Sequence, residues 1–359
     1  MGEILGLGCT HYPGLTVPDE QLPSLFHRLL TAPNVPEHYK NPANWPAELV
    51  AELGNDEGLS AARRYSARLG DDFRAIRKAL DAFNPDVVLV WGDDQYENFR
   101  EDIIPAFCVL GYDDDFATQP WHNGDAGRGN GGRPNRWGEA GDWQLKLHGH
   151  RDMAKYLATG LIERGIDMAY AYQPLHHKLA HAFTNTALYL DWDRQGFPYP
   201  VVPFAINCYG SNLLHAKGGT AALFMPPRDP GEAVDPPSPH PWRCMEVGRA
   251  VAETLAQSPW RVALIASSSW SHCFLSPTNG YLWPDHKADR LLFDALSRRD
   301  YDTWRKRPLA AMEQAGQHEM LNWCALMGAM EHLDRKPVVQ DYVETHIFAS
   351  EKCFVSYPA

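Results

Sequence analysis

The chain has 359 residues, of which 44% are hydrophobic and 22% charged, so it carries enough apolar material for a large folded core and too much for a disordered protein. Its formal net charge is -12 and no basic stretch is present, which argues against binding to nucleic acid through the phosphate backbone. The first residues lack a signal-peptide pattern and no run of about 18 apolar residues occurs, so we expect neither secretion nor a membrane-spanning segment.

The seven cysteines are scattered along the chain and include no Cys-x-x-Cys pair. This pattern is typical of reduced thiols, and it favours a cytoplasmic location. The cysteine pattern does not determine the oligomeric state, and a homo-oligomer is compatible with this pattern. The sixteen histidines are more informative, because histidine supplies metal ligands and proton carriers near neutral pH.

Short apolar segments bounded by turn residues predict buried strands, at residues 3–8, 86–92, 200–210 and 260–269. Segments with helical periodicity accompany them, at residues 58–83, 153–165, 244–258 and 318–333. Strands that alternate with helices predict an α/β fold with a mostly parallel central sheet covered by helices. We expect a catalytic domain over residues 1–300 and a helical C-terminal extension over 301–359 packed on it.

Two polar stretches have no apolar period and are expected to be loops. Residues 112–143 are rich in Gly, Asp and Asn, which favours a long loop or lid. Residues 226–241 are rich in proline and predict another surface excursion.

Chemistry-bearing side chains follow three of the expected strands. His11 follows the first strand, Asp94 the second, and His272 the strand at 260–269. A parallel sheet brings the ends of its strands to one edge, where ligands collect. Two histidines and one carboxylate form the ligand set of a non-haem Fe(II) site with open positions for substrate and O2. Each of these residues also has a purely structural interpretation. A histidine after a strand often hydrogen-bonds the backbone of a turn, and an Asp often caps the next helix.

Two further histidines, His177 and His181, are separated by four residues in the segment 174–191. If this segment is helical, both side chains lie on one face. A neutral imidazole beside a metal-bound diol can take a proton and later return it, which makes both histidines candidates for acid–base catalysis. Solvated histidines on a helix face are the alternative interpretation.

Five segments together resemble the class III extradiol ring-cleavage dioxygenases, the superfamily of the LigB-type catalytic subunit of protocatechuate 4,5-dioxygenase. They occur in family order, as GLGCTHYPGL at 6–15, VVLVWGDDQYENF at 87–99, LAHAFTNTALYL at 179–190, YPVVPFAINCYG at 199–210 and ALIASSSWSHCFL at 263–275. In addition, residues 318–330 resemble the small helical subunit or extension of some members. The resemblance implies a non-haem Fe(II) enzyme that uses O2 to open the ring of a catechol-like diol.

Carried over by position, the resemblance makes His11 an iron ligand and His181 the acid–base residue. The chain departs from the family at Asp94, where a second histidine ligand is usual, and at residues 284–289, where many members have a glutamate ligand. Either Asp94 and His272 complete the site, which we prefer, or His286 takes the place of the glutamate. Two other classes stay open, a metal-dependent hydrolase on the same fold and a binding protein that has lost the iron.

Overall fold

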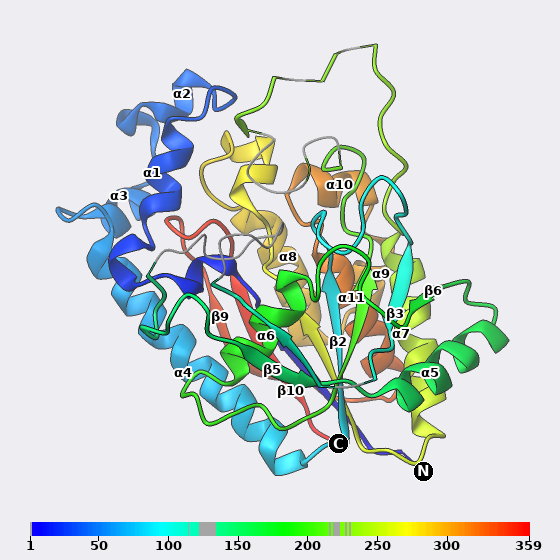
Figure 1. Ribbon diagram of the computed structural model, residues 1–359. Coiled ribbons are helices and arrows are strands. Elements are labelled where there is room, and N and C mark those ends of the chain that lie inside the picture. The colour runs from blue at the N-terminus through cyan, green and yellow to red at the C-terminus, as the bar shows by residue number, and fades with distance from the viewer. Residues whose placement is uncertain are drawn as a thin grey trace.

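The computed structural model describes residues 2–113, 115–121, 134–214, 217, 223–226, 228–229 and 231–359. Within these residues, eight strands form one sheet and two more form a separate hairpin (Figure 1). In spatial order, the sheet contains β6 (Ala169–Ala171), β3 (Phe107–Leu110), β7 (Val201–Ile206), β2 (Val87–Asp93), β8 (Val262–Ser267), β1 (Ile4–Cys9), β10 (Lys352–Tyr357) and β9 (Val338–Val343). The hairpin pairs β4 (Asp115–Thr118) with β5 (Leu145–His148).

The centre of the sheet is parallel, as the sequence predicts. β7, β2, β8 and β1 are neighbours that run in the same direction. Antiparallel pairs occur toward the edges, where β10 joins β1, β9 joins β10, and β3 joins β7. The expected α/β fold is therefore confirmed, and the carboxyl ends of the four parallel strands share one edge.

The central strands are apolar throughout because both faces of the sheet are covered. Along β1, Ile4 packs into the core on one face, and Leu5 and Leu7 pack into the core on the other. Along β2, Leu89 and Val90 divide between the two cores in the same way. Burial on both sides explains why these segments show continuous apolar runs instead of strict alternation with polar residues.

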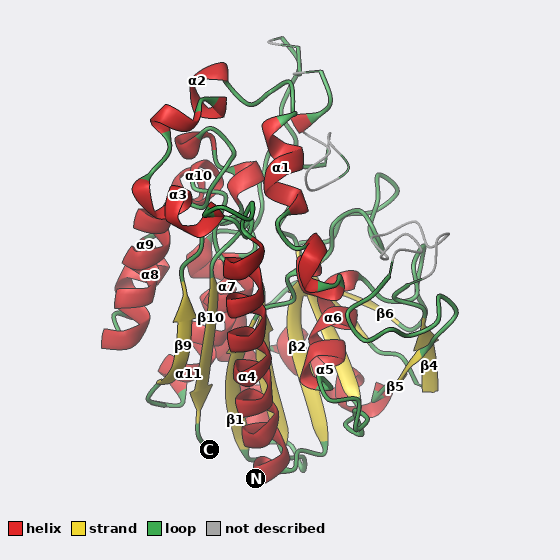
Figure 2. Cartoon of the chain, turned by 90° about the vertical axis from the view of Figure 1, so that its left-hand side faces the viewer, coloured by secondary structure: helices red, strands yellow, loops and turns green. Residues whose placement is uncertain are grey.

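Helices form a layer on each face of the sheet (Figure 2). One layer contains α4 (Leu59–Phe83) and α6 (His181–Leu190), and the other contains α5 (Arg151–Glu163), α7 (Pro241–Ala256) and α11 (Met320–His332). The other described helices are α1 (Ser24–Leu30), α2 (Glu37–Lys40), α3 (Ala47–Leu53), α8 (His286–Arg298), α9 (Tyr301–Lys306) and α10 (Leu309–Gln314).

Helix α11 is buried on every side between the sheet and α7. All residues from Met320 to Met330 are buried, which is typical of a helix inside a large core. Glycines allow the backbones of α7 and α11 to approach closely. A Cβ at Gly248 would lie 1.8 Å from the carbonyl oxygen of Ala325, and a Cβ at Gly328 would lie 1.9 Å from that of Met245.

The C-terminal segment contains strands of the central sheet as well as helices. After α11, the chain returns through β9 and β10, which belong to the central sheet. The domain boundary at residue 300 stays a prediction, but strands from both sides of it share one sheet. Within the expected loop at 112–143, residues 115–118 form β4, whereas residues 114 and 122–133 lie outside the described residues.

Two other expectations concern the thiols and the membrane. All seven cysteines are buried, and all are free. None of the helices in the described ranges combines the length and the apolar composition that crossing a bilayer requires.

Candidate metal centre

The candidate site begins where three parallel strands end at the same edge of the sheet. His11 follows β1, Asp93 is the last residue of β2, and Ser267 ends β8. All three residues are almost completely buried. This is the edge at which an α/β sheet binds ligands, and here it lies inside the protein.

His11 is oriented by the neighbouring strand β8. Its Nδ1 lies 3.1 Å from the carbonyl oxygen of Ser267, which can only accept a hydrogen bond, so Nδ1 carries the proton. The other ring nitrogen, Nε2, lies 3.4 Å from Oδ1 of Asp93 and 3.3 Å from Oε2 of Glu319. Hydrogen bonding of one ring nitrogen to a carbonyl is the usual way in which a protein directs the other nitrogen toward a metal.

Two buried carboxylates face His11 at this site. Burial alone would lower the pKa of His11, but Glu319 and Asp93 outweigh burial and raise that pKa to about 9. Burial and the nearby carboxylate of Glu319 raise the pKa of Asp93. The two buried carboxylates therefore favour positive charge at the point between them and His11.

Asp93 offers an oxygen that no hydrogen bond satisfies. Gln95 Nε2 donates to Oδ2 over 3.1 Å, whereas Oδ1 accepts no hydrogen bond from the described residues. A buried carboxylate oxygen without a partner is costly, and such atoms often mark the place of an ion. This oxygen is the one that faces His11.

Glu319, like Asp93, is a candidate ligand that the sequence patterns did not identify. It immediately precedes α11, and its Oε1 accepts a hydrogen bond from Gln95 Nε2 over 2.7 Å. The backbone N–H of Ser269 donates to Oε2 over 3.2 Å. Burial would raise the pKa of Glu319, but His272 and His11 hold it well below its usual range. The one signal in the sequence is an acidic residue placed directly before a helix that is mostly apolar as far as Met330.

His272 reaches the site through Glu319. Its Nε2 lies 3.2 Å from Oε1 of Glu319, and its Nδ1 has no hydrogen-bond partner among the described residues. His272 therefore lies near His11, as expected, but the carboxylate of Glu319 lies between the two rings.

Two of the spacings between these donor atoms match a small divalent cation. Two donor atoms bound side by side at about 2.1 Å from one ion lie roughly 3 Å apart. The distances from His11 Nε2 to Asp93 and to Glu319 are close to this value. One imidazole and two carboxylates, buried and with an unsatisfied oxygen, fit such an ion.

His181 lies across from His11 at the start of α6. The two ring centroids are 5.1 Å apart, with the rings nearly perpendicular. Potential ligand atoms of His11, Asp93 and His181 all lie within 4.8 Å of one another. Glu97 holds His181 twice, since its Oε2 lies 2.8 Å from Nδ1 and its Oε1 accepts from the backbone N–H over 3.0 Å. With Nδ1 engaged, Nε2 is the nitrogen available for proton transfer.

Asp94 occupies a different environment from the one expected of a metal ligand. Its carboxylate accepts hydrogen bonds from the backbone N–H groups of Glu97, Asn98 and Phe99, over 2.7 to 3.2 Å, and from the hydroxyl of Tyr209 over 2.9 Å. These bonds stabilise the turn after β2. The structure brings Asp93, and not Asp94, to His11.

His177 is not one helical turn before His181. The segment expected to be helical before residue 181 is a series of bends, and α6 begins at His181 itself. The expectation of a shared helix face is therefore wrong for His177. The backbone carbonyl of His177 accepts a hydrogen bond from Asn98, which secures this loop to the turn after β2.

His286, the alternative to the family's glutamate, contacts a different set of residues. It begins α8 and contacts Glu351, and its ring centroid is 4.2 Å from that of His346. Its neighbouring carboxylates are Glu344 and Glu351. The structure does not bring His286 to His11.

A cleft with a volume of about 580 Å³ leads toward the site. It shares Leu213, Leu275 and His318 with a small inner cavity that Asp93 and Glu319 also line. The volume lies within the range of about 300–1,000 Å³ that small-molecule sites occupy. The cleft is therefore the route by which a small molecule would reach the candidate ligands.

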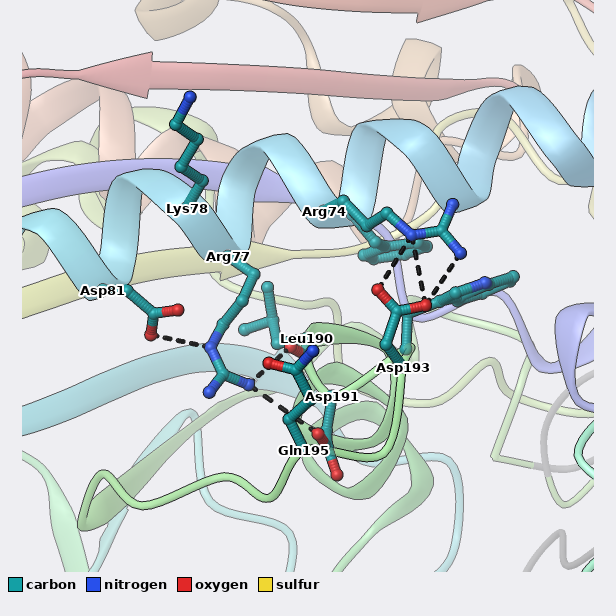
Figure 3. Close-up of a pocket in the computed structure, with 10 residues that line it drawn as sticks. Arg74, Arg77, Lys78, Asp81, Leu190, Asp191, Asp193 and Gln195 are labelled. Atoms are coloured by element: carbon teal, nitrogen blue, oxygen red, sulfur yellow. Dashed lines mark hydrogen bonds and ion pairs between the residues drawn. The ribbon is translucent and has the colours of Figure 1, made fainter.

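A pocket between α4 and the end of α6 has no such connection (Figure 3). Its arginines are paired, since Arg77 contacts Asp81 and the carbonyl oxygen of Leu190, and Arg74 contacts Asp193. The two arginines are thus engaged with their neighbours, and the pocket's lining includes none of the candidate site residues.

The C-terminal third of the chain matches a known family. Residues 232–355 match the model of the catalytic LigB subunit of aromatic ring-opening dioxygenase. Over this region, the chain is similar to the LigB-type dioxygenases. The matched LigB region contains His272 and Glu319, whereas His11, Asp93 and His181 precede it.

The curated proteins to which this chain is similar share the name 2,3-dihydroxyphenylpropionate/2,3-dihydroxicinnamic acid 1,2-dioxygenase. The relative from Photorhabdus laumondii is 25% identical over 59% of this chain and 51% of its own length. The form numbered 2 from Pseudomonas putida is 28% identical over 39% of this chain and 36% of its own length. The chain thus spans about half or less of the length of these two relatives.

A solved structure is also similar to this chain. It is that of the uncharacterized protein JW3007 from Escherichia coli K12, with a TM-score of 0.43 and 12% identity. The alignment covers 79% of this chain and 91% of that one.

Proposed function

We propose that the chain is a ring-opening dioxygenase that acts on a catechol-like diol at an Fe(II) ion held by His11, Asp93 and Glu319. The observation that carries the proposal is the buried donor set, in which Nε2 of His11 lies 3.4 Å from an unsatisfied oxygen of Asp93 and 3.3 Å from Glu319. The similarity to dioxygenases supports the reaction class. Three protein ligands on one side would leave positions for a diol and for O2.

The chain's own residues would provide orientation and proton transfer. His181, held at Nδ1 by Glu97, would accept a proton from a diol hydroxyl at Nε2 and return it later to the opening ring. His272 and Gln95 would position the carboxylate of Glu319. Bound at this site, Fe(II) would supply chelation of the diol and the electron transfer to O2. Burial of all these groups would exclude bulk water.

The test is reconstitution with Fe(II) without air, followed by measurement of O2 uptake with catechols, gallate-like compounds and hydroxylated heteroaromatics. The wild type should consume O2 with at least one of them. His181→Ala should keep its iron, measured by elemental analysis, and lose about 100- to 10,000-fold in kcat, because the acid–base group is gone.

An exposed histidine on α2 provides the control, and His38→Ala should behave as the wild type. Normal turnover by His181→Ala would show that the proton-transfer role is misassigned. Absence of O2 uptake with the whole panel would refute the dioxygenase for these substrates, and product formed without O2 consumption would favour a metal-dependent hydrolase.

A further inference from the structure

The cleft that leads to the candidate metal centre has an uneven distribution of charge. Seven of its lining side chains are apolar or aromatic, namely Leu213, Leu223, Phe274, Leu275, Pro277, Tyr281 and Ala310. The other lining side chains are amides, one histidine and one carboxylate, that of Glu313. Among the described residues that line the cleft, none is a lysine or an arginine.

Glu313 lies next to the part of the cleft that joins the inner cavity. A Cβ added at Gly210 would lie 2.8 Å from Oε1 of Glu313 and 3.0 Å from Cδ2 of His318. Glu313 and His318 therefore pack against the same piece of backbone. Because His318 lines both the cleft and the inner cavity, the Glu313 carboxylate lies beside the route to the candidate ligands.

The carboxylate of Glu313 is only partly satisfied. Ser211 donates to Oε1 from its backbone N–H over 3.3 Å and from its hydroxyl over 3.5 Å, both of which are long contacts. No hydrogen bond from the described residues reaches Oε2. Partial burial raises the pKa of Glu313, and the hydrogen bonds from Ser211 only partly oppose this shift.

Arg228, an arginine that contacts this loop, is already engaged. Arg228 reaches the carbonyl oxygen of Ser211 over 3.5 Å, but its guanidinium pairs with Asp235 over 2.9 Å. It is therefore not available to neutralise Glu313 or to bind an anionic substituent in the cleft. A substrate with a carboxylate would meet one uncompensated negative charge and no described cation.

We infer that the cleft selects diols whose ring bears an amine-type, hydrogen-bond-donating substituent, with Glu313 as the residue that binds this substituent. The inference rests on the proposed function for the position of the diol, which would chelate the ion while the substituent extends along the cleft. An ammonium group would supply both the charge and the donors that Glu313 lacks. A carboxylated substituent of the same length would be disfavoured by like-charge repulsion.

The test compares three probes that share one ring and differ only in the substituent, namely an aminoethyl-, an ethyl- and a carboxyethyl-catechol. Binding to the Fe(II)-loaded protein is measured by calorimetry under argon, and kcat/KM is measured separately by O2 uptake. The aminoethyl probe should bind at least about tenfold more tightly than the carboxyethyl probe, since a charged hydrogen bond replaces a repulsion.

Two variants test the assignment to Glu313. Glu313→Gln should reduce the ratio of the two dissociation constants to about twofold, because the amide retains the shape and loses the charge. Glu313→Lys should favour the carboxyethyl probe. Glu163→Gln, the same change at the exposed end of α5, should leave the ratio as in the wild type.

The possible failures are distinguishable. If the binding ratio behaves as expected but no probe is opened by O2, the proposed function fails and the selectivity of the cleft stands. If the carboxyethyl probe binds as tightly as the aminoethyl probe, if Glu313→Gln leaves the ratio unchanged, or if no probe binds, the inference about Glu313 is overturned.

Discussion

Asp93 and Asp94 are adjacent in the sequence, but their carboxylates meet different surroundings. Asp94 accepts three backbone hydrogen bonds and one from Tyr209. Asp93 instead directs toward His11 an oxygen that has no hydrogen-bond partner in the described part of the chain. A carboxylate surrounded by donors from its own chain is fixed as part of a turn. One without them is available to a cation.

This difference predicts opposite outcomes for two similar substitutions. Asp93→Asn should weaken Fe(II) binding by about 100-fold or more, because it removes a negatively charged ligand. Asp94→Asn should retain iron and lower the free energy of unfolding by about 2 kcal/mol, because the amide NH2 cannot accept from the backbone N–H groups. Iron titration and urea unfolding of both variants provide the measurements. Loss of iron from Asp94→Asn but not from Asp93→Asn would restore Asp94 as the ligand.

At the level of elements, α11 connects the packing of the core with the candidate site. It crosses α7 at the distance that Gly248 and Gly328 allow, and Glu319 precedes its first turn. The position of Glu319 relative to His11 therefore depends on this crossing. Helix α6 has an equivalent role for His181, which is its first residue.

A methyl group where α7 and α11 cross should disturb both the packing of these helices and the candidate metal centre. Gly328→Ala would place a Cβ 1.9 Å from the carbonyl oxygen of Met245, so the helices must separate. We expect a loss of about 3 kcal/mol in the free energy of unfolding, measured with urea. Gly141→Ala serves as the control, because a Cβ there would have no atom within 4 Å. Equal stability of the two variants would contradict the close crossing.

At the scale of the whole molecule, the acidic chain buries a lysine in its core. Lys352 begins β10, and its Nζ donates to the hydroxyl of Ser350 over 3.2 Å and lies 3.9 Å from the ring centroid of Tyr12. Burial lowers the pKa of Lys352 to about 7, although Glu351 opposes this shift. Unfolding exposes this lysine to water, where its pKa returns to about 10.4.

The folding stability should therefore depend on pH through Lys352. Between pH 7 and 10 the unfolded lysine is protonated while the native one is mostly neutral, so the unfolded state binds more protons and stability rises with pH. The difference in the free energy of unfolding between wild type and Lys352→Met should change by about 4 kcal/mol across this window. Urea unfolding at several pH values measures it. Lys78→Met, at an exposed position on α4, should keep the wild-type pH dependence, and the same dependence in Lys352→Met would contradict the assignment.

The parallel sheet and the main helices could be predicted from the sequence, because apolar runs and helical periods are local consequences of burial. The sequence also identified His11, which follows an expected strand, and His181, through the resemblance to the family's acid–base histidine. The choice between Asp93 and Asp94 depended on the direction in which each side chain leaves the end of β2, which adjacent positions in the sequence do not reveal.

Only the tertiary structure brought Glu319 to His11, because the two residues are far apart in sequence and meet through the packing of α11 on the sheet. Glu313 is a similar case, because its proposed role depends on the lack of a lysine or arginine among the described residues that line the cleft. Secondary structure follows from short-range patterns, whereas a buried charge cluster is created by long-range packing, and that is why the fold could be predicted further than the site.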